Sequence, residues 1–220
     1  VEVLVRIQGA DAAQAPAESI RARPPQALAL VIDRSGSMAG RPLDEAKRCA
    51  GYVLSQLRPS DALSLVQFDN RVQRLWPAVP LGDGAPLRAA IAGIHSGGNT
   101  HLHGGWREGA DTLADVPGTG LKRVILLSDG QANEGLTDAA AISAQCAEWA
   151  ARGVTTSTYG LGNNFNEALM VAMAFSDDSQ VSLLAHFSVS VAASVRAFCC
   201  AGLSRFQRSA AISTIRPDWM

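Results

Sequence analysis

The stretch LVIDRSGSMAG, residues 30–40, decides both the fold and the chemistry of this chain. It begins as an apolar run typical of a buried strand. It then changes abruptly to a carboxylate and two hydroxyls at alternate positions, Asp33, Ser35 and Ser37. A tight turn from a strand into a helix can aim such side chains at one point, and Gly36 permits the bend. We therefore interpret this stretch as the end of a core strand that carries candidate ligands.

Short apolar runs alternate with segments of helical period from residue 27 onward. Strands separated by helices form a parallel sheet that is covered on both faces. The run 71–77 follows its predecessor after two residues, which is too short for a crossover and predicts an antiparallel edge strand. The sequence thus predicts an α/β fold with a doubly wound, mostly parallel, Rossmann-like sheet. Strands are expected at 27–33, 62–68, 71–77, 122–129 and 154–162, and helices at 42–57, 85–94, 104–116, 137–153 and 166–174.

Two further loops offer similar side chains at the same end of the expected sheet. Asp129 follows the strand 122–129, and Thr100 lies in a glycine-rich loop that enters a helix. Ligands of open α/β sheets bind at the carboxyl ends of the strands. Two carboxylates and three hydroxyls are oxygen donors without a thiolate, which suits a hard cation: magnesium, or else manganese or calcium.

The segments DRSGSM, a later threonine in a glycine-rich loop and a later SDG resemble the metal-ion-dependent adhesion site (MIDAS) of von Willebrand factor A-type (VWA) domains. The resemblance covers roughly residues 27–174, with the parts in the family's order. It implies that Ser35 and Ser37 bind the cation directly. It further implies that Thr100 binds directly or through water, and that Asp33 and Asp129 act through waters. The expected edge strand 71–77 also has its counterpart in the family fold.

This resemblance implies a binding module and not an enzyme. A cation held mostly by neutral hydroxyls keeps positive charge and an exchangeable water, which an Asp or Glu of a partner protein can replace. Two alternatives stay open at this point. One is a metal-assisted hydrolase that uses the same oxygens, and the other is an adaptor subunit of an ATPase or chelatase machine. The sequence names neither the partner nor the oligomeric state.

Helix capping is a structural alternative for the acidic and hydroxyl residues. Asp33 and Ser37 could cap the helix expected near Pro42, and Asp129 could cap the next one, since Asp and Ser are favoured there. The DRSGSM segment, the threonine of the glycine-rich loop and the SDG segment occur together, in this order and at strand ends, which favours the metal site over helix capping.

Zinc binding, hydrolysis and nucleotide binding have weaker signals in the sequence. His95, His101 and His103 could be zinc ligands, but no cysteine is nearby in the sequence. Ser35 is outside the G-x-S-x-G context of hydrolase nucleophiles, although His101 could serve as its base. No G-x-x-x-x-G-K segment is present, and residues 160–167 lack the third glycine of a dinucleotide-binding loop.

Composition sets the remaining expectations. With 19 Lys and Arg against 20 Asp and Glu, the chain is not expected to bind nucleic acid. No secretory signal is visible, and Cys49, Cys146, Cys199 and Cys200 show no CxxC spacing, so reduced thiols and a cytoplasmic location are expected. A signal lying upstream would instead make the protein secreted.

Three units are expected along the chain: a strand and linker at 1–25, the domain core at 26–175, and a divergent segment at 176–220. The last unit either supplies a final strand, at 181–187, or results from a change of reading frame. The apolar stretch 181–203 is interrupted by His186 and Arg196 and is expected to form buried strand and helix, not a membrane span.

Overall fold

The structure is a computed structural model that describes residues 24–118, 120–162 and 165–174. The first and last expected units, apart from residues 24 and 25, and the apolar stretch 181–203 lie outside these residues. In chain order the elements are β1 (Ala27–Asp33), a 3-10 turn (Gly36–Met38), α1 (Arg41–Gln56), β2 (Ala62–Phe68), β3 (Val72–Pro80), α2 (Ala85–Ala92), α3 (Leu102–Ala114), β4 (Lys122–Ser128), α4 (Ala139–Ala151), β5 (Val154–Gly160) and α5 (Glu167–Ala174).

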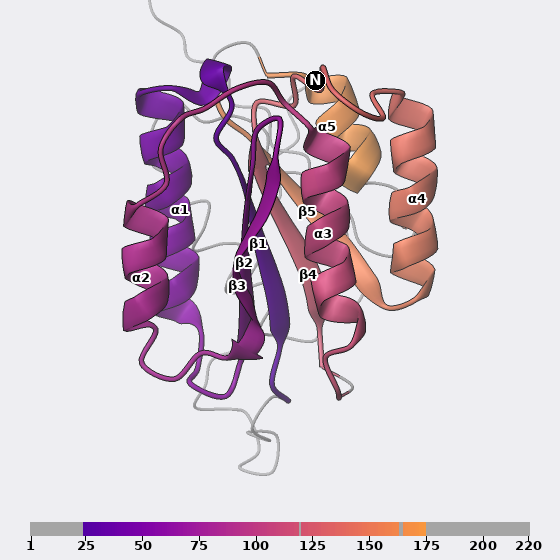
Figure 1. The fold of residues 1–220 in the computed structure, drawn as a ribbon. Coiled ribbons are helices and arrows are strands. Elements are labelled where there is room, and N and C mark those ends of the chain that lie inside the picture. Colours follow the sequence, from indigo (N-terminus) through magenta and orange to yellow (C-terminus); the bar gives the residue numbers. More distant parts are fainter. Residues whose placement is uncertain (1–23, 119, 163–164, 175–220) are drawn as a thin grey trace, which may run out of the picture.

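The described elements form one five-stranded sheet with helices on both faces (Figure 1). Its strand order is β3-β2-β1-β4-β5, and only the pair β2 and β3 is antiparallel. This confirms the predicted doubly wound, mostly parallel fold with an antiparallel edge strand. Strand order reverses between β2, on one side of β1, and β4 on the other. The carboxyl end of β1 is therefore the place where a ligand is expected.

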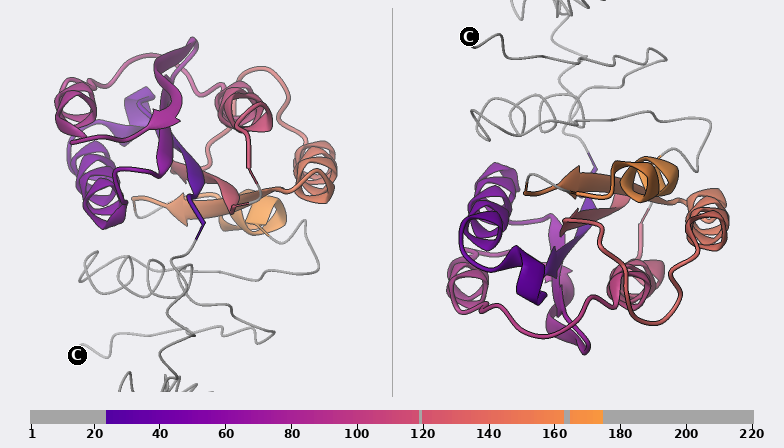
Figure 2. Two further views of the ribbon diagram at one scale, coloured as in Figure 1. Left: turned by 90° about the horizontal axis from the view of Figure 1, so that it is seen from below. Right: turned by 90° about the horizontal axis from the view of Figure 1, so that it is seen from above.

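Helices lie on both faces of the sheet, as the views from below and above show (Figure 2), and an apolar layer lies between the helices and the sheet on each face. On one face, the buried side of α1 and α2 packs against alternate residues of the central strands, including Leu30 and Ile32 of β1. On the other face, α3, α4 and α5 cover the residues in between, including Val31. All seven residues of β1 are buried, because a central parallel strand is covered on both sides.

Several element boundaries differ from the expected ones for local reasons. Helix α3 begins at Leu102, before the two glycines at which the sequence pattern placed its start. Helix α4 begins only at Ala139, because the Asp138 side chain accepts a hydrogen bond from the Ala141 N–H and caps the helix. Strand β3 continues to Pro80, which its position at the edge of the sheet allows. No helix among the described residues is long and apolar enough to cross a membrane.

Helix α3 packs directly against the sheet at two glycines of its inner face, Gly105 and Gly109. A Cβ at Gly109 would lie 2.5 Å from Cγ2 of Val31, and one at Gly105 would overlap the ring of Phe68. Phe68 is the last residue of β2, so this contact holds the beginning of α3, and the loop before it, next to the carboxyl end of the sheet.

We predict that Gly109→Ala destabilises the protein by about 1–3 kcal/mol, because the added methyl group overpacks a buried contact. Gly51→Ala on α1 is the matched control. Nothing lies within 4 Å of a Cβ at Gly51, so there the better helix propensity of alanine should stabilise by about 0.5–1 kcal/mol. Urea denaturation of the two variants and the wild type measures both effects. Equal effects of the two substitutions would contradict the close packing of α3.

Candidate metal centre

Asp33 lies at the centre of the candidate site, where β1 ends between β2 and β4. Its side chain is fully buried, and both carboxylate oxygens accept hydrogen bonds. The Ser35 N–H donates to Oδ1 at 2.8 Å, and the Ser128 hydroxyl donates to Oδ2 at 2.6 Å. Each carboxylate oxygen has a second lone pair left to accept from a water or to face a cation.

The environment of Asp33 disfavours its charge in the metal-free protein. Burial is the main cause that raises the pKa of this carboxyl from 3.8 to about 6, and the negative charge of Asp129 adds to it. The hydrogen bonds from Ser128 and Ser35 act in the opposite direction. A nearby cation would stabilise the ionised form, so these residues fit a positively charged ligand.

Two hydroxyls of the turn after β1 lie together. Oγ of Ser35 and Oγ of Ser37 are 3.2 Å apart and share a hydrogen bond. Ser35 is buried and Ser37 is exposed, so the pair reaches from the interior to the surface. The alternation of these two residues with Asp33 therefore brings one carboxylate and two hydroxyls into one turn.

The loop that carries Thr100 lies against this turn. The Gly36 N–H donates to the Gly98 carbonyl at 2.9 Å. The Thr100 N–H donates to Oδ1 of Asn133 at 2.8 Å, and the Asn133 N–H donates to the Thr100 carbonyl at 3.2 Å. Thr100 itself is buried, with 1% of its surface exposed. Backbone contacts thus hold Thr100 between the turn after β1 and the loop after β4.

Asp129 belongs to the loop after β4 and is also buried. Its Oδ1 accepts a hydrogen bond from the Gln131 N–H at 3.0 Å. Gly130 adopts a φ of +68°, which favours glycine, and its N–H donates to Oγ of Ser128 at 2.9 Å. The sequence SDG therefore forms a tight turn that keeps Asp129 near enough to influence the pKa of Asp33.

In the structure Asp33, Ser37 and Asp129 do not cap the helices that follow them. Gly40 occupies the position before α1, and no side chain caps that helix. Asp33 instead spans from its own turn to β4, through Ser35 and Ser128. Asp138, not Asp129, caps α4.

The zinc alternative also lacks support. Among the described residues, no three His, Cys, Asp or Glu side chains are close enough together to hold a metal ion. His103 is paired with Gln145, at 2.9 Å between Nε2 and Oε1, and the ring of His101 lies against Gly104 and Gly135. The donors that gather at the strand ends are hydroxyls and two carboxylates, which suit a hard divalent cation.

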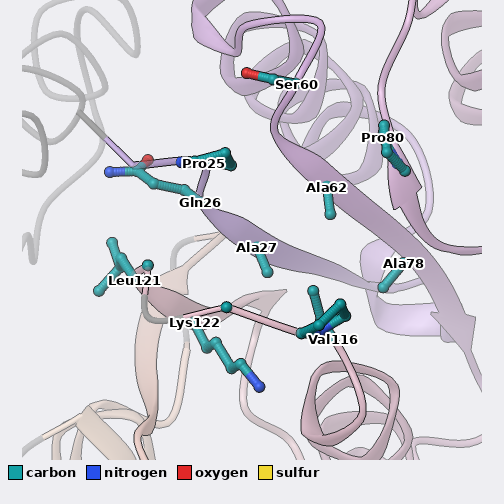
Figure 3. Close-up of a pocket in the computed structure, with 13 residues that line it drawn as sticks. Pro25, Gln26, Ala27, Ser60, Ala62, Ala78, Pro80, Val116, Leu121 and Lys122 are labelled. Carbon is teal, nitrogen blue, oxygen red and sulfur yellow. The ribbon is translucent and has the colours of Figure 1, made fainter. Parts of the chain in front are cut away.

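A cavity of about 180 Å³ lies elsewhere, at the opposite end of the sheet (Figure 3). The labelled residues include Ala27, Ala62 and Lys122 at the beginnings of β1, β2 and β4, Pro80 at the end of β3, and Val116 after α3. Its lining is mostly apolar and carries no carboxylate. This cavity is therefore separate from the candidate metal centre.

Two residues that matter for the arrangement were not predicted as part of the site. Ser128 ties Asp33 to β4, and Asn133 holds Thr100. A signal for Ser128 was present, since it directly precedes Asp129 at a strand end. Asn133 is four residues beyond Asp129 in an irregular loop, and nothing in the sequence pattern indicated its partner.

Comparisons with known proteins agree with this architecture. The sequence model of the von Willebrand factor type A domain matches residues 27–193 and so extends past residue 175. The chain is 29% identical over 174 residues to the protein sll0103 of Synechocystis, a match that covers 79% of this chain and 41% of that protein. The chain spans less than half the length of this and other curated relatives.

Solved structures share the fold. A von Willebrand factor type A protein from Catenulispora acidiphila superposes with a TM-score of 0.62 at 18% identity, covering 82% of this chain and 42% of that one. Proximal thread matrix protein 1 of the mussel byssus, in a structure with a zinc-occupied MIDAS motif, gives a TM-score of 0.59 at 19% identity. That match covers 70% of this chain and 42% of the mussel protein.

We predict that Asp33→Asn removes the loss of stability that Asp33 causes in the metal-free protein as pH rises through 6. In the folded wild type this carboxyl titrates near 6, against 3.8 in the unfolded chain, so between these values only the folded state holds the proton. The contribution of Asp33 to the free energy of unfolding therefore falls as pH rises from 4 to 7, by about 2 kcal/mol. Asparagine removes this loss, since it does not titrate.

Urea denaturation in EDTA at several pH values between 4.5 and 7.5 measures this effect. The difference in unfolding free energy between Asp33→Asn and the wild type should grow in favour of the variant as pH rises. A difference that does not change with pH would contradict the buried, charge-disfavouring environment of Asp33.

Proposed function

The chain belongs to the von Willebrand factor type A family, and on that premise we propose that it is a non-enzymatic module that binds a carboxylate of a partner protein through a divalent cation. In this proposal Ser35, Ser37 and Thr100 hold the cation through their hydroxyls. Asp33 and Asp129 contact the cation through water molecules and not directly. When bound, the cation supplies positive charge and an exchangeable position for an Asp or Glu of the partner.

The observation that carries this proposal is the pair of hydroxyls, 3.2 Å apart, that extends from the buried carboxylate of Asp33 to the surface at Ser37. Of these groups only Ser37 is exposed, while Asp33, Ser35, Thr100 and Asp129 are buried behind it. A cation held by these groups would therefore face solvent on the side of Ser37, which is the side that a partner can approach.

The choice of ion follows from the donor set. Hydroxyl and carboxylate oxygens favour magnesium or manganese, with calcium as a further possibility. The zinc-occupied MIDAS motif of the mussel neighbour supports the view that this fold accepts a divalent ion. The hard donors in this chain favour magnesium over zinc.

An enzymatic role has less support. A metal-assisted hydrolase needs a general base within hydrogen-bond reach of the attacking group. The ring of His103 is engaged by Gln145 and so does not serve as a base in this conformation, and the ring of His101 lies against Gly104 and Gly135. An adaptor role in an ATPase or chelatase machine would use the same binding chemistry with a different partner.

We predict that Ser37→Ala and Thr100→Ala each weaken Mn²⁺ binding by about tenfold or more. Outer groups around a metal already contribute about 10–100-fold to affinity, and a direct ligand contributes no less. Titration calorimetry of EDTA-treated protein with MnCl₂ and MgCl₂ measures this. Thr112→Ala is the matched control, because its hydroxyl bonds the Glu108 carbonyl within α3 and should leave the affinity unchanged. Wild-type affinity in both site variants would remove the proposed site.

Partner capture has its own test. We predict that an array of peptides carrying a single Asp or Glu shows binding in Mn²⁺ that disappears in EDTA, and that the Asn or Gln counterparts do not bind. The Ser37→Ala variant should lose this ion-dependent binding. Binding that is equal in Mn²⁺ and EDTA would contradict capture through the cation.

A further inference from the structure

Asp69 is a buried carboxylate at the candidate site to which the motif assigns no role. It follows β2 directly, and 3% of its surface is exposed. Its Oδ1 accepts the Arg71 N–H at 2.7 Å. Its Oδ2 receives the Gly98 N–H at 3.3 Å and is paired with the Arg34 guanidinium at 2.6 Å. One side chain thus joins the turn after β1, the end of β2 and the glycine-rich loop.

The backbone of Asp69 holds the same loop at a second point. The His101 N–H donates to the Asp69 carbonyl at 2.8 Å. Gly98 and His101 lie on either side of Thr100 in the sequence, so Asp69 fixes the loop before and after the residue proposed as a ligand. The conformation of residues 98–101 therefore depends on where Asp69 lies.

Arg34 completes this attachment from the other side. Its guanidinium donates to the His95 carbonyl at 3.2 Å, and its own carbonyl accepts the Gly97 N–H at 2.6 Å. Its Nε is buried and has no hydrogen-bond partner among the described residues. A buried donor without an acceptor costs stability, so stabilising the fold is a poor explanation for this arrangement.

The two glycines of the loop make the attachment possible. A Cβ at Gly97 would overlap the carboxylate of Asp69, and one at Gly98 would lie 2.6 Å from Oδ1 of Asn70. The loop therefore lies directly on Asp69 and Asn70 because it has no side chains at these positions.

We infer that Asp69, with Arg34, is a positioning residue of the metal centre: it holds the 95–101 loop so that the Thr100 hydroxyl meets the hydroxyls of Ser35 and Ser37. This inference rests on the proposed function. The hydrogen bonds and ion pair of Asp69 go to Arg34, Arg71, Gly98 and His101, so we assign its effect on the ion to the placement of Thr100. In this inference Asp69 and Arg34 together determine where the Thr100 hydroxyl lies, and hence the affinity for the ion.

A double-mutant cycle tests whether Asp69 acts through Thr100. Asp69→Asn should weaken Mn²⁺ binding by about 10–100-fold in the wild-type background, as expected for groups that orient a metal ligand. In the Thr100→Ala background the same substitution should have little further effect, because the hydroxyl that it positions is gone. Titration calorimetry of EDTA-treated protein gives the four affinities. If the double variant loses affinity by the product of the two single fold-losses, Asp69 acts independently of Thr100 and the inference is overturned.

Arg34→Gln separates positioning from simple electrostatics. Removing a positive charge near the site should strengthen cation binding if charge alone matters. Positioning predicts the opposite, a weaker affinity, because His95 and Asp69 lose their link to the turn after β1. Stronger Mn²⁺ binding by Arg34→Gln would overturn the inference. Should Asp69→Asn fail to fold in thermal unfolding, this variant carries the test.

Glu108→Gln is the matched control, since it removes an ion pair with Arg74 that has the same 2.6 Å separation but links β3 to α3. It should leave Mn²⁺ affinity unchanged. Failure of the inference is distinct from failure of the proposed function. If Thr100→Ala and Ser37→Ala both bind Mn²⁺ as the wild type does, the metal site itself is wrong. If these variants weaken binding and Asp69→Asn does not, only the role of Asp69 is wrong.

Discussion

The burial of the Asp33 carboxylate is the constraint on which the site depends. A charged group at the end of a strand that is covered on both faces is unfavourable unless it is hydrogen-bonded. The chain meets this requirement with the Ser35 amide from its own turn and the Ser128 hydroxyl from the neighbouring strand. The bonds that make the buried carboxylate tolerable are therefore the bonds that bring the turn after β1 to the end of β4. The part of the cost that they leave uncompensated appears as a pKa raised to about 6, and a cation would relieve it.

The parallel sheet converts this local requirement into a site with several loops. Residue Ile32 pairs with Leu127 and Asp33 with Phe68, so Ser128 and Asp69 are the next residues to emerge on either side of Asp33. The glycine-lined face of α3 then determines how near its preceding loop comes to them. Thr100 is fixed by contacts from both sides, through Asp69 and Asn133, and not by a preference of its own loop. The candidate centre is in this sense a product of strand register and helix packing.

The sequence predicted what depends on short-range pattern. Alternating apolar runs and helical periods gave the elements and their order, and the two-residue connection gave the antiparallel edge strand. The alternation of Asp33, Ser35 and Ser37 gave the local part of the site, since one turn determines it. Contacts that depend on register were not predicted, because the partners are far apart in the sequence. Ser128 bonds to Asp33 across 95 positions, Asp69 to Gly98 across 29, and Asn133 to Thr100 across 33. Boundaries such as the start of α3 were also missed, because its first turns contain two glycines whose role is close packing and not termination.

The distribution of charge explains why a cation would act as a condition for binding in the proposed function and not merely as an addition to it. Without the ion, the end of the sheet holds the buried carboxylates of Asp33 and Asp129 behind the exposed Ser37, so a partner's carboxylate would meet negative charge in a poorly solvated place. With the ion, the same carboxylates support a positive centre that the hydroxyls do not neutralise. The sign of the local field thus reverses while the protein groups stay where Asp33, Ser128 and the loop at Thr100 hold them. Specificity for an acidic residue then follows from electrostatics, and the exposed residues around Ser37 decide which protein presents it.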